Sequence, residues 1–325
     1  MPPDFATALA AVIRRTIDGA SGIARLRALS GGAVQETWAF EAQTPAGAVP
    51  LILRRVRPAL RRDRKSGVSI VEEAQLLRVA AASGVPVPPV RAVLRPEDEA
   101  GEGFIMDFVP GETIARKILR DAEFAAIRPK LARRCGEILA RIHAIDTGPL
   151  AFLDGVTPAG FVAENFSLYD QLEHRSPVFE LAFRWLRDHA PPPPARAALV
   201  HGDFRNGNLI IGADGVRAVL DWELAHLGDP MTDLGYICVN SWRFGEIDKP
   251  VGGFGEREEL HAGYEAAGGR LDRARAAFWE LACTLRWGMN CLTMGRQFIT
   301  GVDRSVERGA IGRRMSETEI DLLRL

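Results

Sequence analysis

Cysteine is scarce in this sequence of 325 residues, and long hydrophobic runs are absent. The four cysteines form no CxxC pair, so neither a disulfide scaffold nor a zinc site is indicated. No apolar run reaches the ~18 residues that a membrane span needs. Asp4, Asp18 and two arginines interrupt the N-terminal stretch, unlike a signal peptide. We therefore expect a cytoplasmic protein without a membrane partner.

The charges of the chain are almost balanced. Its 41 basic and 42 acidic residues leave a net charge of -1, which provides no general attraction to nucleic acids. Only four of the basic residues are lysine. Seven basic residues gather in the segment 54–65, but a nucleic-acid patch would also have interleaved aromatic residues, and this segment has none. We expect this basic segment to be a solvated loop or to touch an anionic substrate.

The N-terminal third is predicted to be rich in strands. Short segments with β-branched or alternating apolar residues are separated by turns that contain glycine or proline. A helix interrupts them, which gives the order β-β-β-α-β-β. The predicted strands are 25–29, 34–41, 49–56, 90–94 and 104–109, and the predicted helix is 71–83.

The remaining chain has mostly helical periodicity, for example over 124–145, 161–189 and 273–298. Three short apolar segments, 198–200, 209–211 and 216–220, predict strands, and a Gly-Ala-Asp-Gly turn joins the last two. The length is about twice the ~150 residues of a typical domain. We predict an α+β fold with a small β-rich lobe, residues 1–109, and a larger helical lobe, residues 110–325.

The residues that suggest chemistry lie near the strands at 198–220. The order is His201-Gly-Asp203, then Asn208, and then Asp221 at the end of the following strand. Oxygen ligands of this kind suit Mg²⁺. The order also matches kinases, in which a loop Asp accepts a proton from a hydroxyl while an Asn and a second Asp bind Mg²⁺. Turn capping explains any one of these residues but not the ordered set.

With these motifs the sequence resembles the aminoglycoside phosphotransferase family, a small-molecule branch of the protein-kinase-like fold, over most of its length. The family has an HGDxxxxN loop, a DxE or DxD strand end and a Gly-Asp-Pro-x-x-Asp-Leu segment, and all three occur here. The resemblance implies a bilobal kinase-like fold that binds ATP, with GTP as the alternative, and Mg²⁺. It implies Asp203 as catalytic base, Asn208 and Asp221 as metal ligands, and Glu223 as an additional contact to metal or substrate. Asp229 and Asp233 are expected to brace the helix near 231–242.

Kinase-like enzymes hold the nucleotide phosphates with a lysine on the third strand and a glutamate on a helix. Here the third strand reads Leu-Ile-Leu-Arg-Arg, and Lys65, the only lysine in the first hundred residues, lies in a loop. The resemblance therefore implies that Arg54 takes this place, with Ile52 on the same strand face toward the adenine. A guanidinium is a planar fork and no equivalent of an ammonium. The helix partner is expected to be Glu73, with Glu72 as the alternative.

The same resemblance implies two backbone contacts to the nucleotide. The loop 30–37, which contains Gly31, Gly32 and Gln35, would cover the phosphates, although it is not a GxGxxG loop. The strand 104–109 would lead into the hinge, where the backbone from Asp107 to Val109 would meet the adenine edge.

A small-molecule acceptor is predicted, because too few residues follow Asp221 for a segment that docks a peptide. Polycationic aminoglycosides call for acidic pockets, but the helix 273–298 carries four arginines and one glutamate. Arg286 lies among apolar residues and is either paired with a core carboxylate or meets an anionic substrate. The C-terminal section also resembles kinase-like domains associated with acyl-CoA dehydrogenases, which favours a hydroxylated acyl or carboxylic acid substrate.

Two other functions stay open at this point. One is aminoglycoside O-phosphorylation, and the other is a nucleotide-binding pseudokinase without turnover. The complete set of Asp203, Asn208 and Asp221 argues against a pseudokinase, whereas the missing strand lysine argues for one. The sequence contains no P-loop motif, which argues against a P-loop enzyme. No nucleic-acid partner is expected, and the oligomeric state is not predicted.

Overall fold

The computed structural model describes residues 3–29, 35–56, 67–172 and 174–325. The chain divides into two compact units, the first comprising residues 1–111 and 217–224 and the second comprising residues 112–216 and 225–325. The segment 217–224, which contains Asp221, therefore belongs with the N-terminal residues. Over the described ranges, no helix has the length and apolar character needed to cross a membrane.

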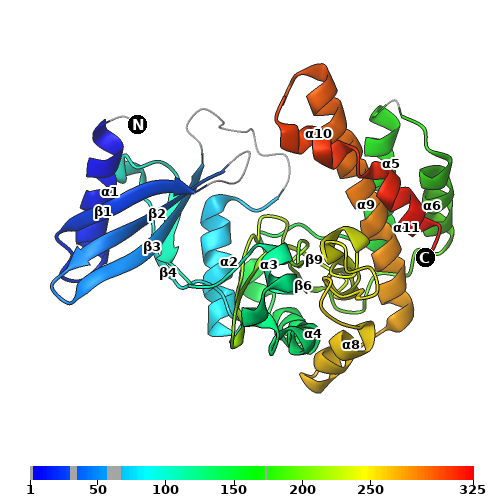
Figure 1. The fold of residues 1–325 in the computed structure, drawn as a ribbon, viewed down its shortest axis with the longest axis horizontal. Helices are drawn as coiled ribbons and strands as arrows, with labels where there is room; N and C mark the ends of the chain where they lie inside the picture. The colour runs from blue at the N-terminus through cyan, green and yellow to red at the C-terminus, as the bar shows by residue number, and fades with distance from the viewer. Residues whose placement is uncertain (1–2, 30–34, 57–66, 173) are drawn as a thin grey trace. The chain divides into compact units, whose positions relative to one another are not determined.

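The first unit is built around a five-stranded sheet in the order β1-β2-β3-β5-β4 (Figure 1). All four neighbouring pairs are antiparallel. The turn between the second and third strands lies at residues 45–46, as the glycine and proline signals predict. The strands are β1 (Gly22–Leu29), β2 (Gln35–Thr44), β3 (Gly47–Val56), β4 (Val90–Val93) and β5 (Gly103–Asp107).

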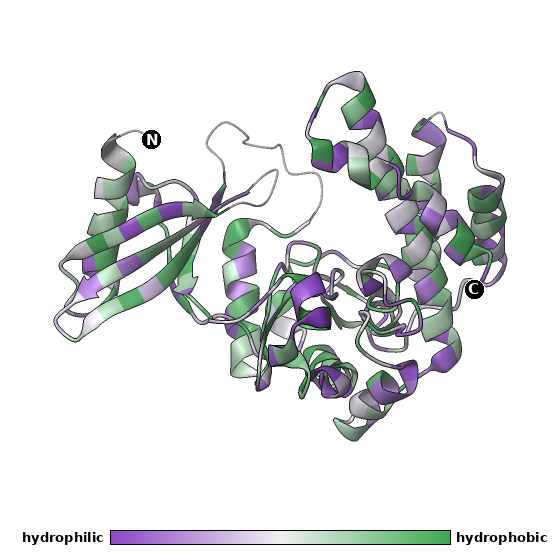
Figure 2. Ribbon diagram, viewed as in Figure 1, coloured by the Kyte–Doolittle hydropathy of each residue, from purple (hydrophilic) through white to green (hydrophobic). Residues whose placement is uncertain are grey.

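The core of the first unit lies on one face of this sheet, which the helix α1 (Pro3–Thr16) covers. Figure 2 shows hydrophilic and hydrophobic residues alternating along β1. Because successive side chains of a strand point to opposite faces, Ile52 and Arg54 lie on the face opposite to this core. The core residues include Leu9, Ile13, Phe40, Leu51, Leu53 and Ile105.

The helix α2 (Ile70–Ala82) begins with a capping box. The Ser69 hydroxyl accepts from the Glu72 backbone N–H, and the Glu72 carboxylate accepts from the Ser69 N–H at 2.8 Å. The following residue, Glu73, is turned into the interior and is 1% exposed. The helix ends at Ala82, before Gly84 with φ of 74°.

The second unit is mostly helical and contains the long helix α9 (Arg273–Thr300). The helices α7 (Met231–Tyr236), α10 (Val306–Gly312) and α11 (Met315–Leu322) pack against it. Figure 1 shows α10 and α11 beside α9. The short strands β6 (Ala198–Val200) and β9 (His226–Gly228) pair antiparallel. Residues 213–214 connect β7 (Leu209–Gly212) to β8 (Gly215–Val219). The other helices are α3 (Ala115–Arg120), α4 (Leu131–His143), α5 (Pro158–Gln171), α6 (Pro177–Asp188) and α8 (Arg257–Ala266).

Three predicted helices differ from those observed. The single helix predicted over 161–189 is two helices, α5 and α6, because Pro177 at the start of α6 and its N-cap Ser176 begin a new helix. The helix predicted over 124–145 starts only at Leu131, after a single 3-10 turn that contains Pro129. The helix predicted over 231–242 ends at Tyr236, and a 3-10 turn follows over Asn240–Arg243.

Candidate functional site

In the second unit, the loop between β6 and β7 carries Asp203. It comprises residues 201–208, since β6 ends at Val200 and β7 begins at Leu209. Gly202 and Gly207 in this loop have φ values of 80° and 115°, which L side chains rarely adopt. The Asp203 side chain is 13% exposed. The loop therefore presents a largely buried carboxylate with a small accessible surface.

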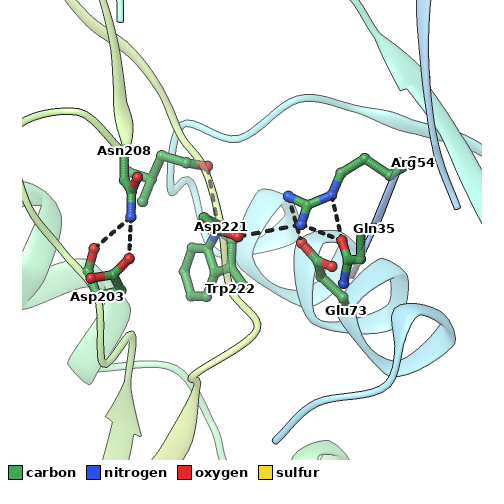
Figure 3. Close-up of polar contacts among 8 residues, drawn as sticks. Gln35, Arg54, Glu73, Asp203, Asn208, Asp221 and Trp222 are labelled. Atoms are coloured by element: carbon green, nitrogen blue, oxygen red, sulfur yellow. Dashed lines mark hydrogen bonds and ion pairs between the residues drawn. The ribbon is translucent and has the colours of Figure 1, made fainter. Parts of the chain in front are cut away.

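Three side chains of the same unit hold this carboxylate, and we call Asp203, Arg205, Asn208 and Tyr236 the loop cluster. Asn208 Nδ2 donates to Asp203 Oδ2 at 2.6 Å and to the Asp203 carbonyl at 3.0 Å (Figure 3). Asp203 Oδ1 accepts from the Tyr236 hydroxyl at 2.7 Å and from Arg205 Nε at 3.1 Å. The structure thus brings together the residues predicted as base and as amide ligand.

A buried carboxylate from α7 braces the backbone of this loop. Asp233 is 0% exposed and accepts from the N–H groups of His201 and Gly202 at 2.8 and 2.9 Å. Its Oδ2 also lies 3.1 Å from His143 Nε2. Burial works to raise the pKa of Asp233, but the hydrogen bond with His143 and nearby positive charge hold this pKa below its ordinary value. Asp233 therefore braces the loop rather than its own helix.

In the first unit, four residues distant in sequence meet at one guanidinium, and we call Gln35, Arg54, Glu73 and Asp221 the clamp cluster. Arg54 Nη1 lies 3.1 Å from Glu73 Oε1, and Arg54 Nη2 donates to Asp221 Oδ1 at 3.3 Å (Figure 3). Gln35 Oε1 accepts from Nε and Nη2 of Arg54 at 3.1 and 2.5 Å. The Arg54 side chain is 13% exposed.

Burial and charge oppose each other in the clamp cluster. Burial works to lower the pKa of Arg54, but Glu73 and Asp221 outweigh it and raise this pKa. Burial raises the pKa of Glu73 to about 7, although Arg54 acts in the opposite direction. Of the two helix carboxylates considered from the sequence, Glu72 is used in the capping box, and Glu73 is the one that contacts Arg54.

The residues predicted at the adenine edge lie on or just after the sheet. Ile52 pairs with Met106 across β3 and β5 and is 7% exposed. The Asp107 N–H donates to the Pro89 carbonyl at 3.0 Å, so this donor is already used within the first unit. Val109 follows β5 and is half-buried. Gly31, Gly32, Lys65 and residues 57–66 of the basic segment lie outside the described residues.

The two predicted substrate contacts belong to different units. Glu223 is an exposed residue of the first unit, and its carbonyl accepts from the Val68 N–H at 3.1 Å. Arg286 of α9 is half-buried in the second unit, with its guanidinium 5.7 Å from the centre of the Phe161 ring. Within the parts of the chain that are described, no carboxylate lies at ion-pairing distance from Arg286, so the core partner considered above is not found there.

Sequence reasoning missed Tyr236, Arg205 and His143, which act on Asp203 or on its loop. Tyr236 follows Asp233 by three residues in α7, and such pairs share one face of a helix. That spacing was the available signal, because it places a tyrosine beside the carboxylate that holds the loop. His143 lies 90 residues from Asp233, and no local spacing rule relates them.

Each of the two predicted metal ligands carries an oxygen of the kind that suits Mg²⁺. Asn208 turns its amide nitrogen toward Asp203, so its amide oxygen faces away from that carboxylate. Asp221 has φ of 67°, unusual for a residue other than glycine, and its side chain is 34% exposed. No group of three or more His, Cys, Asp or Glu forms a metal cluster among the described residues. Mg²⁺ does not need one, because it binds one or two protein carboxylates together with water and phosphate oxygens.

Comparison with models of protein families gives a match over most of the chain. Residues 25–279 match the model described as "Phosphotransferase enzyme family", APH. Among curated proteins, acyl-CoA dehydrogenase family member 10 of Mus musculus is 31% identical over 188 residues, which is 54% of this chain. The same match covers 17% of the mouse protein, so the similarity concerns a small part of that relative.

Comparison with solved structures supports the fold. A putative aminoglycoside phosphotransferase from Ralstonia eutropha superimposes with a TM-score of 0.73 at 24% identity, covering 97% of both chains. A thermostable mutant of the aminoglycoside phosphotransferase APH(4)-Ia, solved as a ternary complex with AMP-PNP and hygromycin B, gives a TM-score of 0.62 at 17% identity, with 97% of this chain and 98% of that chain covered. The α+β kinase-like fold predicted from the sequence is thereby confirmed.

Proposed function

This chain belongs to the phosphotransferase enzyme family, and from that premise we propose that it transfers the γ-phosphoryl group of ATP to a hydroxyl of a small anionic molecule, such as a hydroxylated acyl or carboxylic acid. The observation that carries the transfer chemistry is the Asp203 carboxylate, held in a braced loop with the Asn208 amide at 2.6 Å. Such a carboxylate can orient a hydroxyl and accept its proton.

In the proposed reaction the first unit binds the nucleotide. Arg54 is a planar fork that can hold two phosphate oxygens at once, and its contacts with Glu73 and Gln35 fix the direction of that fork. Asp221 and Asn208 would hold Mg²⁺, which supplies positive charge next to the phosphate oxygens. Asp203 accepts the proton of the acceptor hydroxyl. Catalysis then depends on positioning and fixed charge rather than on a covalent intermediate.

The preference for an anionic acceptor rests on Arg286. A half-buried guanidinium is costly without a counter-charge, and the described residues provide an aromatic ring but no carboxylate within ion-pairing distance. The positive charge of Arg286 also reaches Tyr236: burial raises the pKa of Tyr236 well above its ordinary value, and Arg286 works against this rise. This supports a bound carboxylate or acyl anion as the partner of Arg286.

The test is a search for phosphorylated product by mass spectrometry. The enzyme and its Asp203→Asn variant are each incubated with Mg²⁺ and ATP and with two acceptor panels, one of aminoglycosides and one of hydroxy acids and their CoA esters. We expect product from the second panel only. Asp203→Asn should keep its affinity for ATP and lose at least ~10²-fold in kcat, the usual scale for a general base.

Each outcome separates the candidate functions. Product from the aminoglycoside panel alone would overturn the anionic acceptor and leave the kinase chemistry in place. Tight binding of Mg-ATP without product from any acceptor would favour the pseudokinase. Equal kcat in wild type and Asp203→Asn would remove Asp203 from its proposed role as base.

A further inference from the structure

The hydrogen bonds of the Asp203 carboxylate indicate which of its two oxygens can accept a proton. A carboxylate offers about four lone-pair directions, two on each oxygen. Oδ1 accepts from the Tyr236 hydroxyl and from Arg205 Nε, whereas Oδ2 accepts from Asn208 alone. Among the described residues, Oδ1 is therefore saturated, and Oδ2 has one direction left for an incoming hydroxyl.

Both donors to Oδ1 are fixed on the same aromatic ring. The Arg205 guanidinium lies 4.6 Å from the centre of the Trp242 ring, and the Tyr236 ring lies 5.5 Å from it. Trp242 is 4% exposed and Tyr236 is 6% exposed, so neither ring moves without disturbing the interior. Burial and the charge of Asp203 raise the pKa of the Tyr236 hydroxyl well above its ordinary value, so this group stays protonated and remains a donor.

We propose that Tyr236 is a positioning residue, which fixes Oδ1 of Asp203 and thereby makes Oδ2 the atom that accepts the proton of the acceptor hydroxyl. This inference rests on the proposed function. In the step, the acceptor O–H bond breaks and its proton moves to Oδ2. The acceptor oxygen forms a bond to the γ-phosphorus, while the bond from that phosphorus to the bridging oxygen breaks and releases ADP.

The chain provides a matched control for removing this hydroxyl. It contains three tyrosines, and Tyr169, 1% exposed, accepts from the Ser176 backbone N–H at 2.7 Å. Tyr236→Phe and Tyr169→Phe each delete one hydroxyl of a buried side chain that makes a hydrogen bond of 2.7 Å. A merely structural role predicts the same behaviour for both variants, whereas the positioning role predicts a catalytic effect for Tyr236 alone.

The activity measurement uses the acceptor that gives Asp203-dependent product. We expect Tyr236→Phe to lower kcat roughly tenfold, the scale of one hydrogen bond to a charged group, with KM for ATP unchanged. Tyr169→Phe should keep kcat. Should Tyr236→Phe fail to fold, Arg205→Met removes the other Oδ1 donor at a side chain that is 25% exposed, because methionine has no N–H or O–H group, and a loss of kcat is expected there too. An unchanged kcat in the folded variant would overturn the proposal.

A second readout needs no substrate. In protein labelled with ¹³C at the aspartate carboxyl carbons, the NMR signal missing from Asp203→Asn identifies Asp203. This signal should shift in Tyr236→Phe and stay in place in Tyr169→Phe. If wild type shows no turnover with any acceptor, the proposed function fails. The NMR signal still tests the contact between Tyr236 and Asp203 in that case. A signal that does not shift in Tyr236→Phe overturns the inference, whatever the activity.

Discussion

The loop cluster and the clamp cluster are assembled in opposite ways. Asp203, Arg205 and Asn208 lie within six residues of one another in a single loop, and most of the other contacts come from the short helix α7. The clamp cluster instead depends on contacts between distant positions, and Arg54 and Asp221, which are in contact, lie 167 residues apart in the sequence. The loop cluster is therefore fixed mainly by local chain geometry, whereas the clamp cluster is fixed by the packing of a whole unit.

The two clusters also differ in how their charge is balanced. The negative charge of Asp203 is shared among three donors, and Asp233 holds the loop through backbone N–H groups. In the clamp cluster one largely buried arginine faces two carboxylates, and burial raises the pKa of Glu73 to about 7. We therefore expect the loop cluster to fail when a hydrogen bond is lost, and the clamp cluster to respond to pH.

The largest effect is expected from Asp233→Asn. An asparagine has one oxygen where the carboxylate has two, so an amide N–H₂ group would face a loop N–H or His143 and repel it. Breaking such a buried charged contact costs roughly 3–5 kcal/mol, and the free energy of unfolding, measured in urea, should fall by about this much. Activity should fall as well, because the loop that carries Asp203 loses its brace.

Asp229→Asn is the control for that variant. Asp229 is also buried, at 1% exposed, but it pairs with Arg275 and accepts from the Met231 N–H instead of holding the loop. It should lower stability while leaving kcat of the folded protein intact. If the two variants lost activity to the same degree, Asp233 would have no special role in the loop.

The sequence predicts the loop cluster more completely than the clamp cluster, because spacing rules apply to neighbouring residues and not to distant ones. The loop from His201 to Asn208 could be found by spacing alone, because its geometry depends on neighbouring residues. The succession of strands along the first unit was also predictable, since alternation and turn residues act locally, whereas the order of those strands in the sheet was not predicted. Tyr236 was missed, because its contact with Asp203 spans 33 residues and depends on how α7 packs. The division of 161–189 into two helices was predictable from Pro177 and Ser176, although periodicity alone suggested one helix.

A smaller effect is expected in the pH dependence of stability. The pKa of Glu73 is about 7 in the folded protein and about 4.5 in an unfolded chain. Between these values the folded state holds a proton that the unfolded state has lost, so this contribution is complete below pH 4.5 and disappears as pH rises through 7. It is at most roughly 3 kcal/mol.

Urea unfolding of Glu73→Gln at several pH values tests this expectation. The variant lacks the titrating group, so its stability should fall less steeply than that of wild type from pH 5 to 8. Glu72→Gln is the matched control, because that carboxylate is partly exposed and serves the capping box at the same helix turn. If the stability of Glu73→Gln fell with pH as steeply as that of wild type, Glu73 would not be the group that causes this pH dependence.

The smallest effect is expected from Arg54→Lys, which keeps the charge of the clamp and removes the fork. An ammonium cannot contact Gln35, Glu73 and Asp221 with the separate nitrogens that the guanidinium uses. We expect the affinity for Mg-ATP, measured by calorimetry, to fall about tenfold, which corresponds to about 1.4 kcal/mol, while the melting temperature changes little.

Arg55→Lys is the control for Arg54→Lys. It shows whether loss of affinity for Mg-ATP is specific to the arginine of the clamp cluster or follows from replacing any arginine of β3. Arg55 points to the opposite face of the sheet, where its guanidinium lies 3.6 Å from the centre of the Phe5 ring and its Nε donates to Glu36 at 2.9 Å. This variant should lower the melting temperature and keep the affinity for Mg-ATP. The opposite pattern, with nucleotide affinity lost in Arg55→Lys and kept in Arg54→Lys, would move the phosphate contact to the other face of the strand. It would then separate nucleotide binding from the clamp cluster altogether.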